Sequence, residues 1–97
     1  MVAKKPKNHK IRAPAEIVHF IRGTHPQLKR KIKSALKCII DDPFAGNSLR
    51  DELKGLKSFR VSRFRIIYRI SSKNIIEIIV IGPRKTIYEE TYRMIKG

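Results

Sequence analysis

The sequence is short of several residue types, and each shortage narrows the class of protein. It has a single cysteine, Cys38, so no intrachain disulfide is possible. Acidic residues number only eight in a chain of 97. No apolar run approaches the roughly 20 residues that a membrane-spanning helix needs. The first residues are basic but lack the apolar core of a signal peptide. We therefore expect a cytoplasmic protein that does not enter a membrane.

Motifs for cofactors and metals are also missing. The sequence has no glycine-rich phosphate-binding loop, and Cys38 has no second cysteine with which to form a zinc motif. The histidines show no metal-ligand spacing, and they are His9, His19 and His25. The acids around residues 41–52 do not suggest a carboxylate pair for hydrolysis. We expect no metal and no small-molecule cofactor, and we expect Cys38 to be a buried, inert thiol on a helix.

Positive charge is what the sequence has in excess. Lysine and arginine total 23, which gives a formal net charge of +15. Such a surplus repels itself in the folded state and attracts polyanions, so nucleic acid, an anionic membrane surface or an acidic protein would each fit. The length allows one modest core. We expect a basic, flexible N-terminus over residues 1–8 and a single domain over residues 9–97.

The first half of this domain predicts a short strand followed by two helices. Residues 9–13 are the candidate strand, and Pro14 suits the first turn of a helix over residues 15–23. Residues 27–42 carry an apolar stripe at helical spacing, which consists of Leu28, Ile32, Ala35, Leu36 and Ile39. A loop is predicted over residues 42–48. Residues 49–56 fit either a helical turn or an extended link.

The second half predicts three strands and a helix. Side chains alternate along a strand, so the change of apolar parity at Ser62 and Arg63 predicts a turn or a bulge there. A second turn is expected over residues 71–74, before a very apolar strand over residues 75–81. Thr86 and Glu89 fit a capping box that starts a short C-terminal helix. The predicted class is α+β, with two N-terminal helices and a short C-terminal helix, the helices packed on one face of a twisted, mostly antiparallel sheet.

Arginines gather on the best-defined of these strands. An apolar face made of Phe64, Ile66, Tyr68 and Ile70 would place Arg63, Arg65 and Arg69 on the opposite face, where Arg60 can join them. A solvated outer face of a sheet would also explain such charges. A polyanion site is favoured, because the planar fork of arginine suits phosphate and no acid occurs over residues 54–76. A further cation pair, Arg84 and Lys85, follows the next strand near Tyr88.

Taken together, these segments resemble the RelE/ParE superfamily of toxins from toxin–antitoxin systems. The resemblance covers roughly residues 26–93, and its marks are the DP-plus-G loop (Asp42, Pro43, Gly46), LKGL over residues 53–56, RVSRFRIIY over residues 60–68 and IGPRKTIY over residues 81–88. It implies a twisted antiparallel sheet with two N-terminal helices packed against it. Many RelE-like members are ribosome-dependent mRNA endonucleases, in which the mRNA 2′-hydroxyl attacks the adjacent phosphate with help from basic and tyrosine side chains.

Position by position, the resemblance implies a catalytic set made of Arg60, Arg65, Arg84 and Tyr88. We further expect a set of RNA-binding residues, which are Lys54, Lys57, Arg63, Arg69 and Lys85. Arginine remains protonated and is a poor base, so the proton acceptor is left among Tyr88, Lys54, Lys57 and the ribosome. The sequence departs from the family at Ser58, where many members carry a basic residue that Lys57 would have to replace.

Three functions stay open for this chain, and a small acidic antitoxin is its expected protein partner. An mRNA endonuclease is favoured, because the ParE branch, which poisons DNA gyrase, lacks the nuclease residues that are retained here. The third alternative is a domain that binds RNA or a partner without catalysis. The expected partners are mRNA, the ribosome and an acidic antitoxin protein with an amphipathic helix that covers or displaces the basic face.

Overall fold

The computed structural model of the protein describes residues 9–71 and 74–96. The predicted flexible segment over residues 1–8 lies outside the described residues. In chain order the elements are β1 (Lys10–Arg12), α1 (Ala15–Gly23), α2 (Pro26–Asp41), the 3-10 turn η1 (Pro43–Ala45), β2 (Asn47–Ser48), the 3-10 turn η2 (Asp51–Leu53), β3 (Lys57–Val61), β4 (Phe64–Ser71), β5 (Ile75–Pro83) and α3 (Ile87–Lys96). The predicted α+β class is confirmed.

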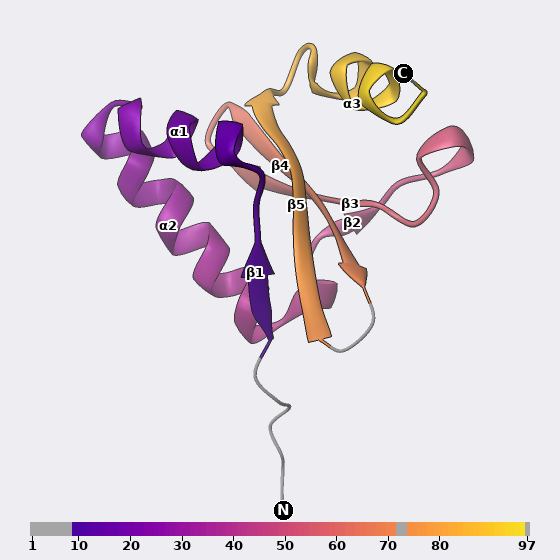
Figure 1. Ribbon diagram of the computed structural model, residues 1–97, viewed down its shortest axis with the longest axis horizontal. Coiled ribbons are helices and arrows are strands. Elements are labelled where there is room, and N and C mark those ends of the chain that lie inside the picture. The colour runs from indigo at the N-terminus through magenta and orange to yellow at the C-terminus, as the bar shows by residue number, and fades with distance from the viewer. Residues whose placement is uncertain (1–8, 72–73, 97) are drawn as a thin grey trace, which may run out of the picture.

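The strands form one mixed sheet in the order β1-β5-β4-β3-β2 (Figure 1). β1 pairs with β5 in parallel, and the other neighbours are antiparallel. β5 is central, as its apolar sequence predicted. Ser62 and Arg63 form the two-residue turn between β3 and β4, and Ser62 adopts the left-handed conformation with φ of 58°. The parity change at these two residues therefore marks a hairpin turn.

Helices α1 and α2 cover one face of the sheet because each has a single apolar side. Ile17 of α1 and the α2 residues Ile32, Ala35 and Ile39 are buried there. They pack against Ile66, Tyr68 and Ile76 of the sheet. The apolar stripe predicted for the second helix is confirmed. None of the helices in the described part of the chain is long and apolar enough to cross a membrane.

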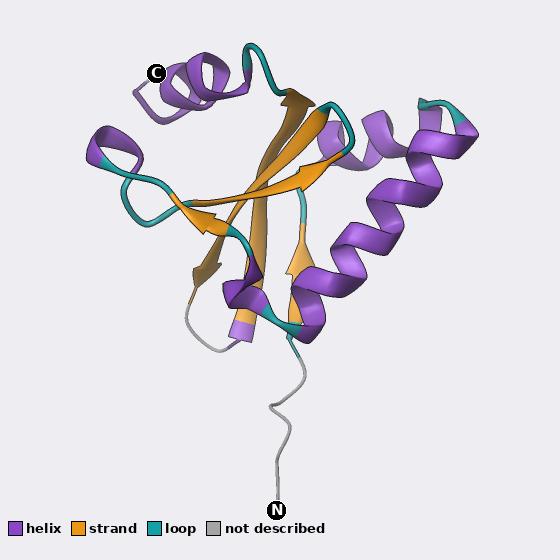
Figure 2. Ribbon diagram, turned by 180° about the vertical axis from the view of Figure 1, so that it is seen from behind, coloured by secondary structure: helices purple, strands orange, loops and turns teal. Residues whose placement is uncertain are grey.

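Helix α3 lies on the opposite face of the sheet, so the prediction of helices on one face is wrong for this helix (Figures 1 and 2). Ile67 alternates with Ile66 and therefore faces away from α2. It is fully buried in a second cluster with Leu56 and Ile87. The Ile67 side chain is shielded from water by the apolar side of the amphipathic helix α3, which packs over it. The arginines of β4 consequently share their face with a helix.

Cys38 is exposed, contrary to the prediction of a buried thiol. Residues of an α-helix are about 100° apart around its axis. The buried positions Ile32, Ala35 and Ile39 therefore fix one side of α2 against the sheet and turn Cys38 toward the outer side. The exposure of Cys38 is determined by its position around the helix axis and not by the apolar residues next to it in the sequence.

The segment predicted as a loop over residues 42–48 contains the turn η1 and the edge strand β2. The buried Tyr68 hydroxyl donates to the Pro43 carbonyl at 2.7 Å and accepts from the Gly46 N–H at 3.1 Å. A Cβ on Gly46 would lie 2.6 Å from that hydroxyl oxygen, so this close approach requires glycine. Burial raises the pKa of the Tyr68 hydroxyl above its ordinary value. The turn is therefore fastened to the core beside β3.

Candidate functional site

The β3–β4 hairpin places two arginines directly opposite each other. Arg60 pairs with Arg65 in the register of the sheet, and both alternate away from the core face that holds Phe59 and Ile66. Opposed like charges on neighbouring strands destabilise a sheet. Within residues 9–71 and 74–96, the ion pairs involve neither of these arginines. The hairpin therefore carries uncompensated positive charge.

A hollow of about 400 Å³ continues this positive region toward the end of β5. The backbone N–H of Arg84 donates to the carbonyl of Arg63 at 2.8 Å, which ties the loop after β5 to the hairpin turn. The hollow is lined by Arg60, Ser62, Arg63, Pro83, Arg84 and Lys85. Four expected site residues, distant in the sequence, thus share one concavity.

A second group of polar contacts lies between the hairpin and α3. Arg65 donates from Nη1 to the hydroxyl of Ser58 at 3.2 Å, and the same hydroxyl is 3.2 Å from the hydroxyl of Tyr88. Ser58 is only 1% exposed, whereas Tyr88 is 38% exposed. Nε of Arg65 is buried and has no hydrogen-bond partner among the residues that the structure describes. A guanidinium and a phenol are therefore held together by one enclosed serine.

The position of Tyr88 depends on how closely α3 approaches β5. A Cβ on Gly82 would lie 2.9 Å from Ile87 Cδ1 and 3.1 Å from Glu90 Oε1, so glycine allows the helix to pack at this distance. Thr86 directly precedes the first helical residue, Ile87, and its hydroxyl donates to the Glu90 carboxylate at 3.4 Å. The capping-box prediction named Glu89, one residue earlier than the observed partner. Gly82 and Ile87 together bring Tyr88 over Ser58.

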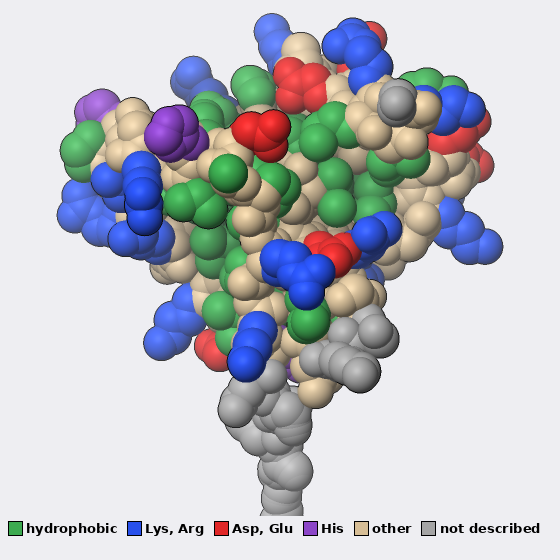
Figure 3. Space-filling model, in the orientation of Figure 1, with side chains coloured by type: hydrophobic (Ala, Val, Ile, Leu, Met, Phe, Trp, Pro, Cys, Tyr) green, Lys and Arg blue, Asp and Glu red, His purple; other side chains and the backbone are tan. Residues whose placement is uncertain are grey.

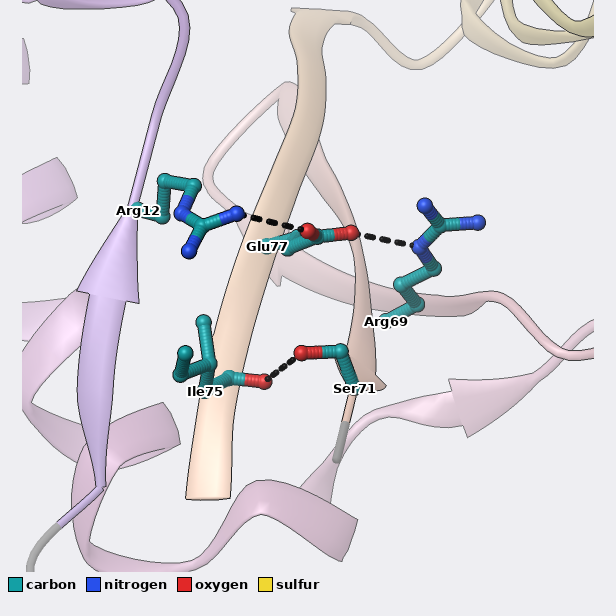
Figure 4. A network of polar contacts seen from close by, with 5 residues as sticks. All are labelled: Arg12, Arg69, Ser71, Ile75 and Glu77. Atoms are coloured by element: carbon teal, nitrogen blue, oxygen red, sulfur yellow. Dashed lines mark hydrogen bonds and ion pairs between the residues drawn. The ribbon is translucent and has the colours of Figure 1, made fainter. Parts of the chain in front are cut away.

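Arg69, an expected RNA-binding residue, forms an ion pair with an acidic side chain. Its Nε lies 2.7 Å from Glu77 Oε1, and Arg12 of β1 lies 3.4 Å from Glu77 Oε2 (Figure 4). The sequence placed no acid close to Arg69 along the chain, but Glu77 pairs with it across β4 and β5. Arg69 therefore differs from Arg60, Arg65 and Arg84 in having a carboxylate partner.

The expected lysines lie apart from Ser58. Lys57 donates to the Ser48 hydroxyl at 3.0 Å, and its Nζ lies 5.4 Å from the centre of the exposed Phe44 ring. Because adjacent residues of a strand point to opposite faces, Lys57 is on the other face from Ser58. It does not occupy the place of the missing basic residue. Lys54 is exposed after η2, and Lys85 lines the hollow.

The sequence identified most of these residues but missed the roles of Ser58 and Gly82. Ser58 was visible only as a departure from the family, and its contacts with Tyr88 come from a residue 30 positions away. Gly82 carried no signal beyond being a glycine after a strand.

What this face can do chemically is bind an anion. In Figure 3 the lysine and arginine side chains lie mostly around the border of the view, and hydrophobic side chains occupy much of its centre, with acidic side chains among them. Among the described residues, no group of three or more His, Cys, Asp or Glu side chains is placed to hold a metal ion. Fixed guanidinium groups can stabilise charge that develops on phosphate oxygens.

Comparisons with known proteins give a family and a fold. The family model described as the ParE toxin of type II toxin–antitoxin systems, parDE, matches residues 12–88. No curated protein matches the chain significantly in sequence.

Solved structures share the fold at low sequence identity. The toxin–antitoxin complex RelBE2 from Mycobacterium tuberculosis has a chain with 22% identity and a TM-score of 0.69, over 80% of this chain and 100% of that chain. A mutant of the E. coli toxin RelE in the free state has 18% identity and a TM-score of 0.69, over 90% of this chain and 93% of that chain. The archaeal RelE–RelB complex from Pyrococcus horikoshii has 16% identity and a TM-score of 0.64, over 80% and 97%.

Proposed function

This chain belongs to the RelE/ParE superfamily of toxins from type II toxin–antitoxin systems, and we propose that it is a ribosome-dependent mRNA endonuclease. One observation carries the proposal. Arg60, Arg65 and Arg84 have no carboxylate partner among the described residues. Arg60 pairs with Arg65 across the hairpin and shares the hollow with Arg84, and Arg65 is linked to Tyr88 through Ser58. In this proposal their common ligand is the scissile phosphodiester of mRNA.

The proposed chemistry is attack of an mRNA 2′-hydroxyl on the adjacent phosphate. Negative charge grows on the phosphate oxygens in the transition state, and preorganised guanidinium groups lower its energy. Arg60 and Arg84 would act from the hollow, and Arg65 from beneath α3. Arginine is not a base at neutral pH, and Lys57 lies on the other face of the sheet. The candidate proton acceptors are therefore Tyr88, Lys54 and groups of the ribosome.

Inhibition of DNA gyrase is the second candidate, and the family match favours it. The matching family model is that of the ParE toxin, and ParE toxins form the gyrase-directed branch of the superfamily. The similar solved structures, in contrast, are described as RelE or RelBE proteins. Under this alternative the arginines would bind a protein or DNA surface and would catalyse no reaction.

Induced expression in bacterial cells separates the two functions. The endonuclease predicts that incorporation of labelled amino acids stops first, whereas gyrase inhibition predicts DNA damage signalling while translation continues. Arg84→Ala and Tyr88→Phe should both relieve the arrest of translation. Arg30→Ala is the matched control, because Arg30 is an exposed arginine on α2 away from the hollow. Arrest that persists unchanged in both site variants would reject the endonuclease.

The proposed partner is an acidic antitoxin. Similar structures include complexes described as RelBE2, RelE–RelB and RelBE toxin–antitoxin complexes. On this chain, an apolar hollow of about 320 Å³ lies beside α3 and is lined by Pro14, Ile79 and Met94 together with Arg12 and Glu77. Glu77 pairs with both Arg12 and Arg69, so this group of charges keeps a net positive charge. Apolar surface beside cationic surface suits an amphipathic helix with acidic residues. Purification from the native host without any small acidic companion would contradict this partner.

A further inference from the structure

We propose that Ser58 is a positioning residue, which makes the Tyr88 hydroxyl a hydrogen-bond donor aimed at the phosphodiester beside Arg65. The inference rests on the proposed function, and it assigns a task to the position where the family pattern is broken. A basic residue there would add a charge. Ser58 instead directs the hydroxyl of a residue that is already present, Tyr88.

The geometry places Ser58 between the two groups. Its hydroxyl oxygen lies 3.2 Å from Arg65 Nη1 and 3.2 Å from the Tyr88 hydroxyl oxygen. Ser58 is on β3, Arg65 on β4 and Tyr88 on α3, so one side chain joins three elements. The backbone of Ser58 pairs with Ile67 on one side and with Asn47 on the other, which fixes its place in the sheet. The Ser58 hydroxyl is therefore held close to Arg65 and Tyr88.

Counting hydrogens gives the direction of the Ser58–Tyr88 bond. A serine hydroxyl has one hydrogen to donate and two lone pairs to accept. Arg65 has only hydrogens to donate, so Ser58 accepts from it. Were Tyr88 also to donate, the hydrogen of Ser58 would be enclosed without an acceptor, which is unfavourable for a side chain that is 1% exposed. Ser58 therefore donates to Tyr88.

The direction of this bond leaves the Tyr88 hydrogen free. The Tyr88 side chain is 38% exposed, so its hydroxyl can donate to a group outside the protein. A phosphodiester oxygen is an acceptor, so the free hydrogen of the Tyr88 hydroxyl matches it. With its hydrogen pointing at the phosphate, Tyr88 is a poor acceptor for the proton of the 2′-hydroxyl, which leaves Lys54 or the ribosome for that task.

A double-mutant cycle on mRNA cleavage tests the inference. The full chain is assayed with purified ribosomes and a defined mRNA, as wild type, Ser58→Ala, Tyr88→Phe and the double variant. We expect Ser58→Ala to lower kcat by about three- to tenfold, the value of one hydrogen bond, with KM unchanged. The double variant should cleave as fast as Tyr88→Phe alone, because Ser58 acts through Tyr88. Ser58→Thr, which keeps the hydroxyl, should retain activity, and Ser34→Ala on α2 is the matched serine control.

Two kinetic results would overturn the inference without touching the proposed function. The first is a wild type that cleaves and a Ser58→Ala variant of equal kcat. The second is a double variant whose loss is the product of the two single losses, since independent residues behave in that way. A wild type that cleaves no mRNA rejects the proposed function instead. Urea unfolding of the same four proteins then decides whether the bond exists, because additive changes in unfolding free energy would also overturn the inference.

Discussion

Arg60 and Arg65 face each other across β3 and β4, and within the described part of the chain neither forms an ion pair with a carboxylate. A sheet chosen for stability alone would place opposite charges or apolar side chains at such a pair. The chain instead keeps two like charges beside a third, Arg84, which lines the same hollow as Arg60. The pair is therefore consistent with the proposed anion site, since an anion would reduce the repulsion.

Arg60→Gln should stabilise the free protein and weaken its activity. Removing one of two opposed like charges relieves repulsion, and we expect the free energy of unfolding in urea to rise by about 0.2–1 kcal/mol. Arrest of translation on induced expression should decrease. Arg30→Gln on α2 is the control and should change neither property. A fall in stability with Arg60→Gln would show that the pair is not repulsive.

Tyr68→Phe should lower stability by roughly 1–3 kcal/mol. The substitution removes one hydroxyl and leaves two enclosed backbone groups, the carbonyl of Pro43 and the N–H of Gly46, without a partner. The ring itself stays in the core, so the loss reports the hydrogen bonds alone. Urea denaturation measures it, and Tyr92→Phe, on an exposed face of α3, serves as the control. Equal stability of the wild type and Tyr68→Phe would contradict the described anchoring of η1.

The same hydroxyl should make stability depend on alkaline pH. Burial is the main reason that the pKa of Tyr68 is raised above 10.0, the ordinary value that it regains on unfolding. Its contribution to stability is therefore complete below about pH 10 and is lost as the pH rises through the folded-state pKa. The difference in unfolding free energy between wild type and Tyr68→Phe should therefore be constant below about pH 10 and shrink as the pH rises above it, so the measurement spans both sides of pH 10. A difference that stays constant on both sides of this pH would refute the enclosed, neutral phenol.

Glu77→Gln should loosen the edge of the sheet and leave cleavage intact. Glu77 holds Arg12 of the edge strand β1 and Arg69 of β4, and both arginines are more than half exposed. Solvent screens such pairs, so we expect a loss of stability of about 1 kcal/mol or less. Hydrogen exchange of the β1 amides should accelerate, because β1 has only β5 as a strand neighbour. Loss of mRNA cleavage in Glu77→Gln would show that Arg69 or its partner belongs to the site.

Periodicity in the sequence predicted those parts of the fold that depend on local pattern. The helical stripe of Ile32, Ala35 and Ile39 and the alternation of Ile66 and Tyr68 each mark a buried side. The parity change at Ser62 located the hairpin turn. Such patterns record which way a side chain must point, and they need no knowledge of distant partners.

The remaining features depend on contacts between distant residues. Arg12 and Glu77 are 65 residues apart, and Ser58 and Tyr88 are 30 apart. The position of α3 is set by Ile67 and by the absence of a side chain at Gly82, and neither is visible from helix periodicity. The sequence grouped Arg69 with the other arginines, but Arg69 forms an ion pair with Glu77 of the neighbouring strand. This contact also joins residues of different strands. The charge pattern in the sequence predicts candidate binding residues. Contacts across the sheet then determine which of these residues lack an acidic partner.

The most direct test of the central claim is analysis of mRNA ends after incubation with purified ribosomes and the toxin, in the absence of gyrase. If Arg60, Arg65, Arg84 and Tyr88 surround a scissile phosphodiester, the wild type cuts ribosome-bound mRNA. Attack by the 2′-hydroxyl leaves a 2′,3′-cyclic phosphate on one fragment and a 5′-hydroxyl on the other. Arg84→Ala should greatly reduce both products, and Arg30→Ala should not. Intact mRNA at a toxin concentration that blocks gyrase supercoiling would contradict the account.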